Sequence, residues 1–313
     1  MHPAKYYDYK NNRPLDMLSD GCDLAEWPNR HEDFRFARHP KGFPIFLPPD
    51  RLASSDEYAD FDPYAVAENI NSEFQARRIE LTIDLVNEAV PQAGRPPRIL
   101  DLGCGQGHIT DRIRQVTHEA EVTGLDYSVS AIEYAHERFP KTSFAVGDAR
   151  DNLFAPRYFD IVVCNNLWEH VPDPLSLLGR IIQVLKPGGY LVMSTPSRYR
   201  FSNLVRVLRG ASVAFMSQYH VTEYTVGQVK EQLAYGGFEV VRITSRPIGA
   251  GGWKAKVARF VFSQLVSIVG SHHQLEATVF YLAQLGQLSR PGTRPTPASQ
   301  GSEAMEASET SHF

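Results

Sequence analysis

The stretch Arg98–Thr110, RILDLGCGQGHIT, contains the pattern that decides the fold. A short apolar run ends near Asp101, and Gly103, Gly105 and Gly107 follow before a helical pattern begins. Glycines at the end of a strand let the backbone approach a ligand closely, because they carry no side chain. The helix that follows offers free N–H groups and the positive end of its dipole. The stretch therefore predicts a nucleotide-binding turn.

The spacing of these glycines and the carboxylates around them indicate which nucleotide it is. The spacing is GxGxG, whereas a dinucleotide fingerprint needs GxGxxG. Asp101 would repel a pyrophosphate and favour a ligand with an ammonium group. Asp126 and Asp148 follow the next two strands, where they suit ribose hydroxyls and an adenine amino group. Together these features describe a nucleoside that carries a cationic amino acid, as in S-adenosylmethionine.

Strands and helices alternate from Arg98 onward, which favours a parallel sheet covered by helices on both faces. The expected strands are Arg98–Leu102, Val122–Leu125, Ser143–Val146, Phe159–Cys164 and Tyr190–Ser194, with a turn at Lys186–Gly189 before the last of them. In the first sixty residues one strand is expected, at Gly42–Leu47. The expected helices are Glu68–Val90, Gly107–Val116, Ser130–Arg138 and Pro174–Leu185.

The later part of the chain continues the pattern. We expect helices at Thr225–Tyr235 and Trp253–Val269 and strands at Phe238–Ile243 and Ala277–Gln284. The two late strands would form an antiparallel pair at the edge of the sheet. From Ser289 to the last residue the chain is poor in apolar residues, and we expect disorder there.

Six motifs in order resemble those of class I S-adenosylmethionine-dependent methyltransferases. They are LDLGCGQG, GLDYS, GDA, FDIVVCNNLWEHVPDP, LKPGGYLVMSTPS and HVTEYTVGQVKEQLAYGGFEVV. The resemblance implies a Rossmann-like α/β fold with a seven-stranded, mostly parallel sheet whose last strand is antiparallel. It also implies that S-adenosylmethionine contacts Asp101, Gly103, Gly105, Asp126, Tyr127, Asp148, Ala149 and Asn165.

This interpretation divides the chain into three parts. Residues 1–60 form an irregular N-terminal extension, residues 61–288 form the methyltransferase domain, and residues 289–313 form the tail. Cap elements are expected at 197–224 and 250–272.

Methyl transfer to an oxygen atom needs a base, because a neutral hydroxyl is a poor nucleophile. His170 follows the fourth strand and His220 follows the fifth, so both are expected where open sheets bind ligands. His220 is our first choice for the base, because the segment after the fifth strand would face the acceptor. Each histidine could instead hold its loop in place, and Glu169 is a lesser candidate.

The leading functional interpretation is O-methylation of a small molecule or of a glycan or lipid intermediate. One alternative is C- or N-methylation of a quinone-like or amine acceptor. The sequence CNNLWEH stands where an NPPY-like motif would indicate N-methylation of adenine or glutamine. Another alternative is a non-catalytic cofactor-binding subunit of a partner enzyme, against which the intact acidic strand ends argue.

Two stretches bear on the acceptor and on partners. The basic stretch Arg198–Gly210 would either meet an anionic acceptor or face solvent. The stretch Trp253–Val269 is apolar over most of a helical projection. We favour its burial against the cap or against a second copy in a homodimer, with peripheral membrane contact or a lipid-linked acceptor as the alternative.

Composition limits the other classes of function. A net charge of −4 gives no strong attraction to nucleic acid. The sequence holds three cysteines and neither a signal peptide nor an apolar run of membrane-spanning length, which favours a cytoplasmic protein.

The N-terminal extension faintly resembles a small zinc-ribbon module that precedes some methyltransferase domains. Cys22 stands there without the cysteine pairs of that module, and a structural zinc site needs four ligands. We therefore expect a metal-free remnant and no metal site.

Overall fold

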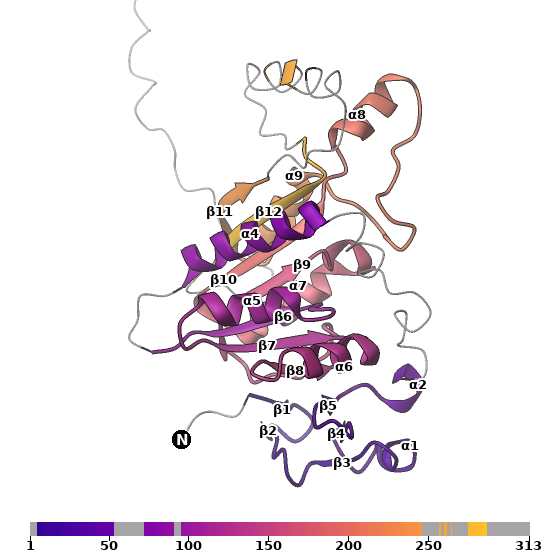
Figure 1. Cartoon of the computed structure of the whole chain (residues 1–313), viewed down its shortest axis with the longest axis vertical. Coiled ribbons are helices and arrows are strands. Elements are labelled where there is room, and N and C mark those ends of the chain that lie inside the picture. The colour runs from indigo at the N-terminus through magenta and orange to yellow at the C-terminus, as the bar shows by residue number, and fades with distance from the viewer. Residues whose placement is uncertain are drawn as a thin grey trace, which may run out of the picture.

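The computed structural model describes residues 5–52, 72–90, 95–245 and 275–286, together with residues 257, 260, 261 and 264. Within this part of the chain, ten strands form one sheet in the order β11-β12-β10-β9-β6-β7-β8-β5-β4-β3. Helices lie along the sheet, and the N-terminal elements continue it at one end (Figure 1). The Rossmann-like α/β class is confirmed.

Seven of these strands are the predicted ones. The parallel strands are β6 (Arg98–Leu102), β7 (Glu121–Asp126), β8 (Ser143–Val146), β9 (Phe159–Asn165) and β10 (Leu185–Pro196). At the edge, β12 (Thr278–Leu285) runs antiparallel to both β10 and β11 (Phe238–Thr244). The antiparallel edge pair is therefore confirmed.

The start of β10 differs from the expected strand. We expected a turn at Lys186–Gly189 and a strand from Tyr190, whereas β10 already begins at Leu185. Leu185 pairs with Phe159, and the register then shifts before Tyr190 pairs with Ile161. The predicted turn thus becomes an irregularity inside one strand, with Gly188 at a φ of 78°.

The two faces of the sheet carry separate apolar clusters. On one face, α4 (Ser72–Ala89) and α5 (His108–Val116) place Leu85 and Ile113 against strand residues such as Val163. On the other face, α7 (Pro174–Val184) and α9 (Val226–Tyr235) place Leu177 and Leu233 against the sheet. A third cluster joins α6 (Val129–Arg138) to β8 and the N-terminal strands.

Side-chain caps explain where several of these helices begin. Ser128 accepts from Ala131 N at the start of α6, and Asp173 accepts from Ser176 N at the start of α7. Thr225 and Gln228 form a reciprocal capping box at the start of α9. These caps fix the helix starts that follow β7, β9 and β10, where the predicted site lies.

The N-terminal extension is continuous with the main sheet. A hairpin of β1 (Tyr7–Asp8) and β2 (Arg13–Pro14) is followed by β3 (Gly21–Asp23), α1 (Trp27–Arg30), β4 (Phe36–Arg38), β5 (Pro44–Ile45) and α2 (Pro49–Leu52). We expected one strand within Gly42–Leu47, and β5 lies there beside β8 through Ile45 and Val146. Strands of two or three residues are too short to show an alternating pattern, so β3 and β4 gave no signal.

Cys22 occupies β3 and is buried in the cluster that contains Trp27 and Phe43. Burial raises the pKa of its thiol above the usual value. A zinc-binding role for the extension therefore has no support here, and its metal-free character stays a prediction.

Two further expectations concern the end of the chain. The tail at 289–313 and most of the cap element at 250–272 lie outside the described residues. No helix in the described part of the chain has the length and apolar character needed to cross a membrane.

The contact between β5 and β8 predicts a large contribution of the extension to stability. Ile45 is fully buried, whereas Leu18 in the same extension is 86% exposed. Ile45→Ala should lower the free energy of unfolding by about 2–5 kcal/mol through lost burial and a residual cavity. Urea denaturation would measure this, with Leu18→Ala as the matched control. Equal stability of the two variants would contradict the packing described.

Candidate functional site

The glycine turn adopts a backbone that its glycines require. Gly103, Gly105 and Gly107 have φ values of 71°, 52° and 76°, in the left-handed region that other residues rarely adopt. A Cβ atom on Gly107 would lie 2.7 Å from the ring of Phe144. The turn is tied to the end of β7, because Gly103 N donates to Leu125 O at 2.8 Å.

Asp126 lies at the end of β7, directly beside this turn. Its two carboxylate oxygens accept from Gly105 N at 2.7 Å and from Ser128 N at 2.9 Å. The residue is 9% exposed. Carboxylate oxygens are acceptors of the kind that ribose hydroxyls need.

Asp101 is a buried carboxyl group at the other side of the turn. It accepts from Thr110 Oγ1 at 2.7 Å and is 2% exposed. Burial raises the pKa of Asp101 to about 7, against the hydrogen bond from Thr110, and the negative charge of Asp126 adds to the rise. A positively charged group beside it would restore the ionised form, as the sequence argument for an ammonium ligand requires.

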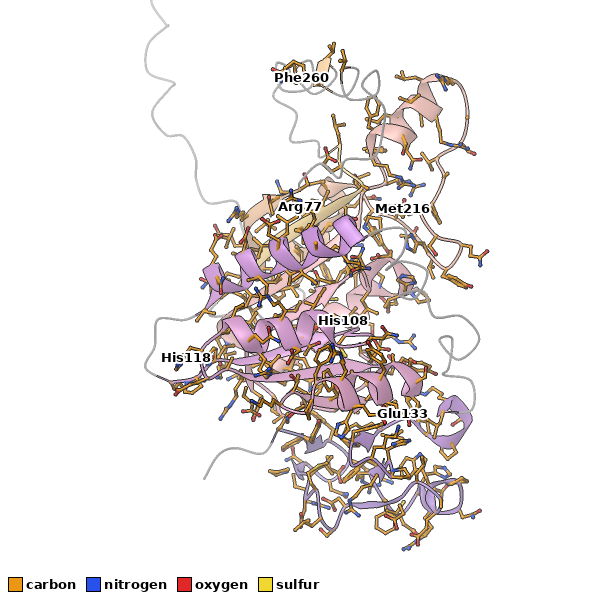
Figure 2. The ribbon with its side chains drawn as sticks, in the orientation of Figure 1. Arg77, His108, His118, Glu133, Met216 and Phe260 are labelled. Atoms are coloured by element: carbon orange, nitrogen blue, oxygen red, sulfur yellow. The ribbon has the colours of Figure 1, made fainter. Side chains whose placement is uncertain are left out.

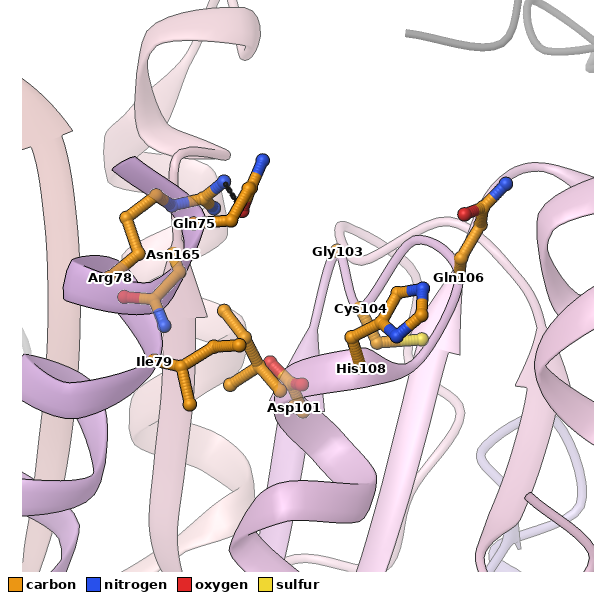
Figure 3. Close-up of a pocket in the computed structure, with 10 residues that line it drawn as sticks. Gln75, Arg78, Ile79, Asp101, Gly103, Cys104, Gln106, His108 and Asn165 are labelled. Atoms are coloured by element: carbon orange, nitrogen blue, oxygen red, sulfur yellow. Dashed lines mark hydrogen bonds between the residues drawn. The ribbon is translucent and has the colours of Figure 1, made fainter. Parts of the chain in front are cut away.

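A cavity of about 180 Å³ lies between the glycine turn and α4, and Figure 3 shows the side chains around it. The turn and the residues after it supply one wall, and α4 supplies the other. The lining consists of Gln75, Arg78, Ile79, Asp101, Gly103, Cys104, Gln106, His108, Ile109 and Asn165.

The α4 wall was not predicted from the sequence. Arg78 donates to Gln75 Oε1 at 3.1 Å at the rim of the cavity. Arg78 places a guanidinium group on the side of the cavity opposite Gly103, where a ligand's carboxylate could bind. The only sequence signal was the amphipathic helix before the glycine turn, which says nothing about which residues face a ligand.

Asn165 is the last residue of β9 and lines the same cavity. Its side-chain amide has only part of its hydrogen bonds satisfied. Its Nδ2 donates to Thr82 Oγ1 at 2.9 Å. Its Oδ1 is buried and accepts no hydrogen bond from the part of the chain that the structure describes. A buried acceptor without a donor is costly, and a bound ammonium or amide donor would satisfy it.

The residues around this cavity fit S-adenosylmethionine. Asp101 and the Asn165 oxygen suit the ammonium group, Arg78 suits the carboxylate, and Asp126 suits the ribose. Gly103 lets the backbone approach the ligand. These roles stay predictions for each residue, but the structure brings the residues together.

Asp148 lies at the end of β8 in a different environment from the one expected. Arg150 donates to it from its backbone N and from Nε, both at 2.9 Å, and from Nη2 at 2.6 Å. Arg51 of α2 donates Nη1 at 3.0 Å. Burial works to raise the pKa of Asp148, but the contacts with Arg150 and Arg51 outweigh it, so its pKa lies below the usual range.

The remaining expected contacts lie around the same strand ends. Tyr127 follows Asp126, and its hydroxyl donates to Arg51 O at 3.4 Å. Ala149 follows Asp148 and is half-buried against the apolar cluster of α7 and α9. Both residues border the region where an adenine ring is expected.

The two candidate bases lie against each other. His170 lies in the short helix η1 (Trp168–His170), and its ring centroid is 4.9 Å from that of His220. Glu169 O accepts from Val221 N at 2.9 Å, which ties the segment of His220 to η1. Burial and the neighbouring His220 lower the pKa of His170. The sequence analysis treated these histidines separately, because they are 50 positions apart in the chain.

A buried glutamate orients the His220 ring. Glu223 is fully buried, and its Oε1 lies 2.9 Å from His220 Nδ1. Its other oxygen accepts from Arg200 Nη1. Burial works to raise the pKa of Glu223, but hydrogen bonds with His220 and Arg200 lower it overall. An ionised Glu223 requires a proton on Nδ1, so neutral His220 carries its lone pair on Nε2.

Two arginines of the stretch Arg198–Gly210 form hydrogen bonds within the cap. Arg200 is 8% exposed and donates to Ser197 O and Ala214 O besides Glu223. Arg206, in α8 (Phe201–Leu208), donates to Ser212 O at 2.8 Å. We expected these side chains either to meet an acceptor or to face solvent. This expectation is wrong for Arg200, because its guanidinium group is buried and pairs with Glu223 inside the cap.

Comparison with known families identifies the domain that contains this site. A family described as a methyltransferase domain matches residues 74–243, which is more than half of the chain. The match includes α4, the glycine turn, the ends of β7 to β10 and both histidines.

Curated relatives match parts of the same region. The ubiquinone biosynthesis O-methyltransferase of Thiobacillus denitrificans is 34% identical over 145 residues, which are 44% of this chain and 61% of that protein. The trans-aconitate 2-methyltransferase of Methylobacterium radiotolerans is 39% identical over 102 residues, which are 32% of this chain and 38% of that protein. The chain thus spans less than two thirds of the length of these relatives.

Solved structures align over a similar region. The crystal structure of an S-adenosylmethionine-dependent methyltransferase from Archaeoglobus fulgidus aligns with a TM-score of 0.45 and 19% identity. The alignment covers 66% of this chain and 94% of that chain.

The buried contacts of Glu223 predict a pH-dependent stability. Glu223→Gln leaves Arg200 buried without its counter-ion and should cost about 3–5 kcal/mol of unfolding free energy at pH 7. Since the folded pKa of Glu223 lies below the ordinary value of 4.5, this stabilisation is complete above pH 4.5 and is lost as pH falls through the lower folded value. Denaturation from pH 3 to pH 7 would measure it, with the exposed Glu231→Gln as control. A cost that does not shrink at low pH would contradict the argument.

Proposed function

The chain belongs to the class I S-adenosylmethionine-dependent methyltransferases, and from that premise we propose that it transfers a methyl group to an oxygen atom of an apolar small molecule. When bound, S-adenosylmethionine supplies a methyl group on a positively charged sulfur. The observation that carries the oxygen acceptor is the contact between His220 and Glu223, since it prepares a base that amines do not need.

The proton of the acceptor has a defined destination in this proposal. Glu223 holds Nδ1 of His220 as a donor, so Nε2 would take the hydroxyl proton as the acceptor's oxygen bonds to the methyl carbon and the carbon–sulfur bond breaks. The carboxylate then lies next to the imidazolium that forms and stabilises it. His170 packs against the ring and restricts its rotation.

The segment around His220 supports an apolar acceptor. Four apolar side chains of this segment are exposed, which are Phe215 at 41%, Met216 at 46%, Tyr219 at 55% and Val221 at 51%. Tyr219 and Val221 directly flank the proposed base. Exposed apolar side chains gathered in one segment mark a surface that binds something.

The names of the relatives agree with a small-molecule acceptor. One is an O-methyltransferase of ubiquinone biosynthesis, and the other is a methyltransferase of trans-aconitate. Both names describe small-molecule acceptors. A glycan- or lipid-linked acceptor, a homodimer and a cytoplasmic location stay predictions from the sequence.

Cofactor binding should depend on the glycine turn and on Asp126. Gly103→Val places a side chain against Leu167, 3.3 Å from the position of its Cβ, in a left-handed backbone. This variant and Asp126→Ala should each weaken S-adenosylmethionine binding at least tenfold in calorimetry. Gly179→Val is the control, because a Cβ there meets nothing within 4 Å. Unchanged affinity in both site variants, with circular dichroism intact, would remove the site assignment.

The base should be separable from cofactor binding. His220→Ala should lower kcat by about 10²–10⁴ and leave the Kd of S-adenosylmethionine within a factor of about two. His170→Ala should lower kcat less, because this ring only restricts its neighbour. Steady-state rates from pH 6 to pH 9 would measure both variants. The reverse order would reassign the base to His170, and normal rates in both would favour an amine or an already ionised acceptor.

A further inference from the structure

The segment around the proposed base contains a second chemical arrangement. Glu169, His170 and His220 each offer one ligand atom, and these three atoms lie within 4.8 Å of one another. Two imidazole nitrogens and one carboxylate oxygen are a common donor set for divalent transition metals. From the sequence we expected no metal, because the N-terminal extension lacks the cysteine pairs of a zinc ribbon, and these three residues were not considered as ligands.

Each of the three side chains is held by a further partner. His220 Nδ1 is 2.9 Å from Glu223 Oε1, and the His170 ring forms a hydrogen bond with the backbone of Tyr219. Glu169 accepts from Asn166 Nδ2 at 3.0 Å and from Thr195 Oγ1 at 3.1 Å. Metal-binding histidines typically donate their other ring nitrogen to a carboxylate or a backbone carbonyl. The partners needed for a built site are therefore already present.

The exposure of these groups suits a bound cation. Glu169 is 1% exposed, so its carboxylate would shield an ion from solvent on one side. His170 is exposed, which gives an ion a route to the cluster.

We propose that Glu169, His170 and His220 bind one divalent transition-metal ion of the Zn²⁺ and Co²⁺ class. The donor set excludes strong Mg²⁺ or Ca²⁺ binding, because those ions prefer oxygen ligands. Bonds of about 2.0–2.2 Å need ligand atoms closer than 4.8 Å, so the side chains must rotate slightly toward the ion.

Metal binding would compete with the proposed base, and this second step rests on the proposed function. The lone pair on Nε2 of His220 can hold either a metal ion or the acceptor's proton. A bound ion therefore blocks methyl transfer. The binding step itself does not depend on the reaction, so the two can be tested apart.

The binding test uses the full chain after chelator treatment, without cofactor or acceptor. Titration with Co²⁺, followed by visible absorption, should show one bound ion per chain with micromolar or tighter Kd. His170→Ala and His220→Ala should each weaken binding at least tenfold. Figure 2 places the control His118 far from Met216 in the His220 segment, and His118 is exposed. A second control is His31→Ala, because His31 is exposed and lies at the end of α1 in the N-terminal extension.

The outcomes are distinct. Loss of binding in both site variants, with both controls normal and circular dichroism unchanged, supports the site. Absence of a stoichiometric Co²⁺ signal, or equal binding by the site variants, overturns it. Zn²⁺ should inhibit methyl transfer over the concentration range in which it binds, with Mg²⁺ as the control ion. Full binding without inhibition would overturn the competition at His220.

Discussion

The site depends first on the carboxylate of Asp126. It accepts a hydrogen bond from Gly105 N and another from Ser128 N, so one side chain holds the glycine turn and the start of α6 together. The turn is itself bonded to β7 through Gly103 N. A carboxylate that only bound a ligand could be replaced without moving the backbone. Here the Asp126 carboxylate holds the backbone of the turn in place and is also predicted to contact the ligand. This double role explains why a strand-end aspartate and a glycine turn occur together.

Glu223 has an equivalent position on the acceptor side. It binds Arg200 from the start of α8 and His220 from the following segment, and it is fully buried. The charge that holds the cap is therefore also the charge that fixes the His220 tautomer. A substitution of Glu223 would therefore change both the stability of the cap and the proposed proton transfer. They can be separated at His220, whose Nε2 takes no part in holding the cap.

The sequence predicted those parts of the molecule whose position follows from a local pattern of residues. The strands from Arg98 to Ser194 were predicted because buried parallel strands are short apolar runs that end in turn residues. Asp101 and Asp126 were expected beside the turn because position at a strand end determines where a side chain lies, whereas Asn165 was expected from the resemblance to the family. The meeting of His170 with His220 was not predicted, since it depends on how two loops fold toward each other. The same holds for Arg78, because no local signal tells which face of α4 meets the turn.

Asp148 shows how a role inferred from position can be modified by a distant segment. A carboxylate has about four acceptor sites, and Arg150 and Arg51 already donate four hydrogen bonds to it. An adenine amino group can be accepted there only if one donor leaves. Arg150 is two residues away and makes three of these bonds, whereas Arg51 makes one and is also bonded to Asp151. Arg51 is therefore the donor that leaves at the lower cost, and it belongs to α2 of the extension. The extension thus contacts the predicted adenine region through a shared carboxylate.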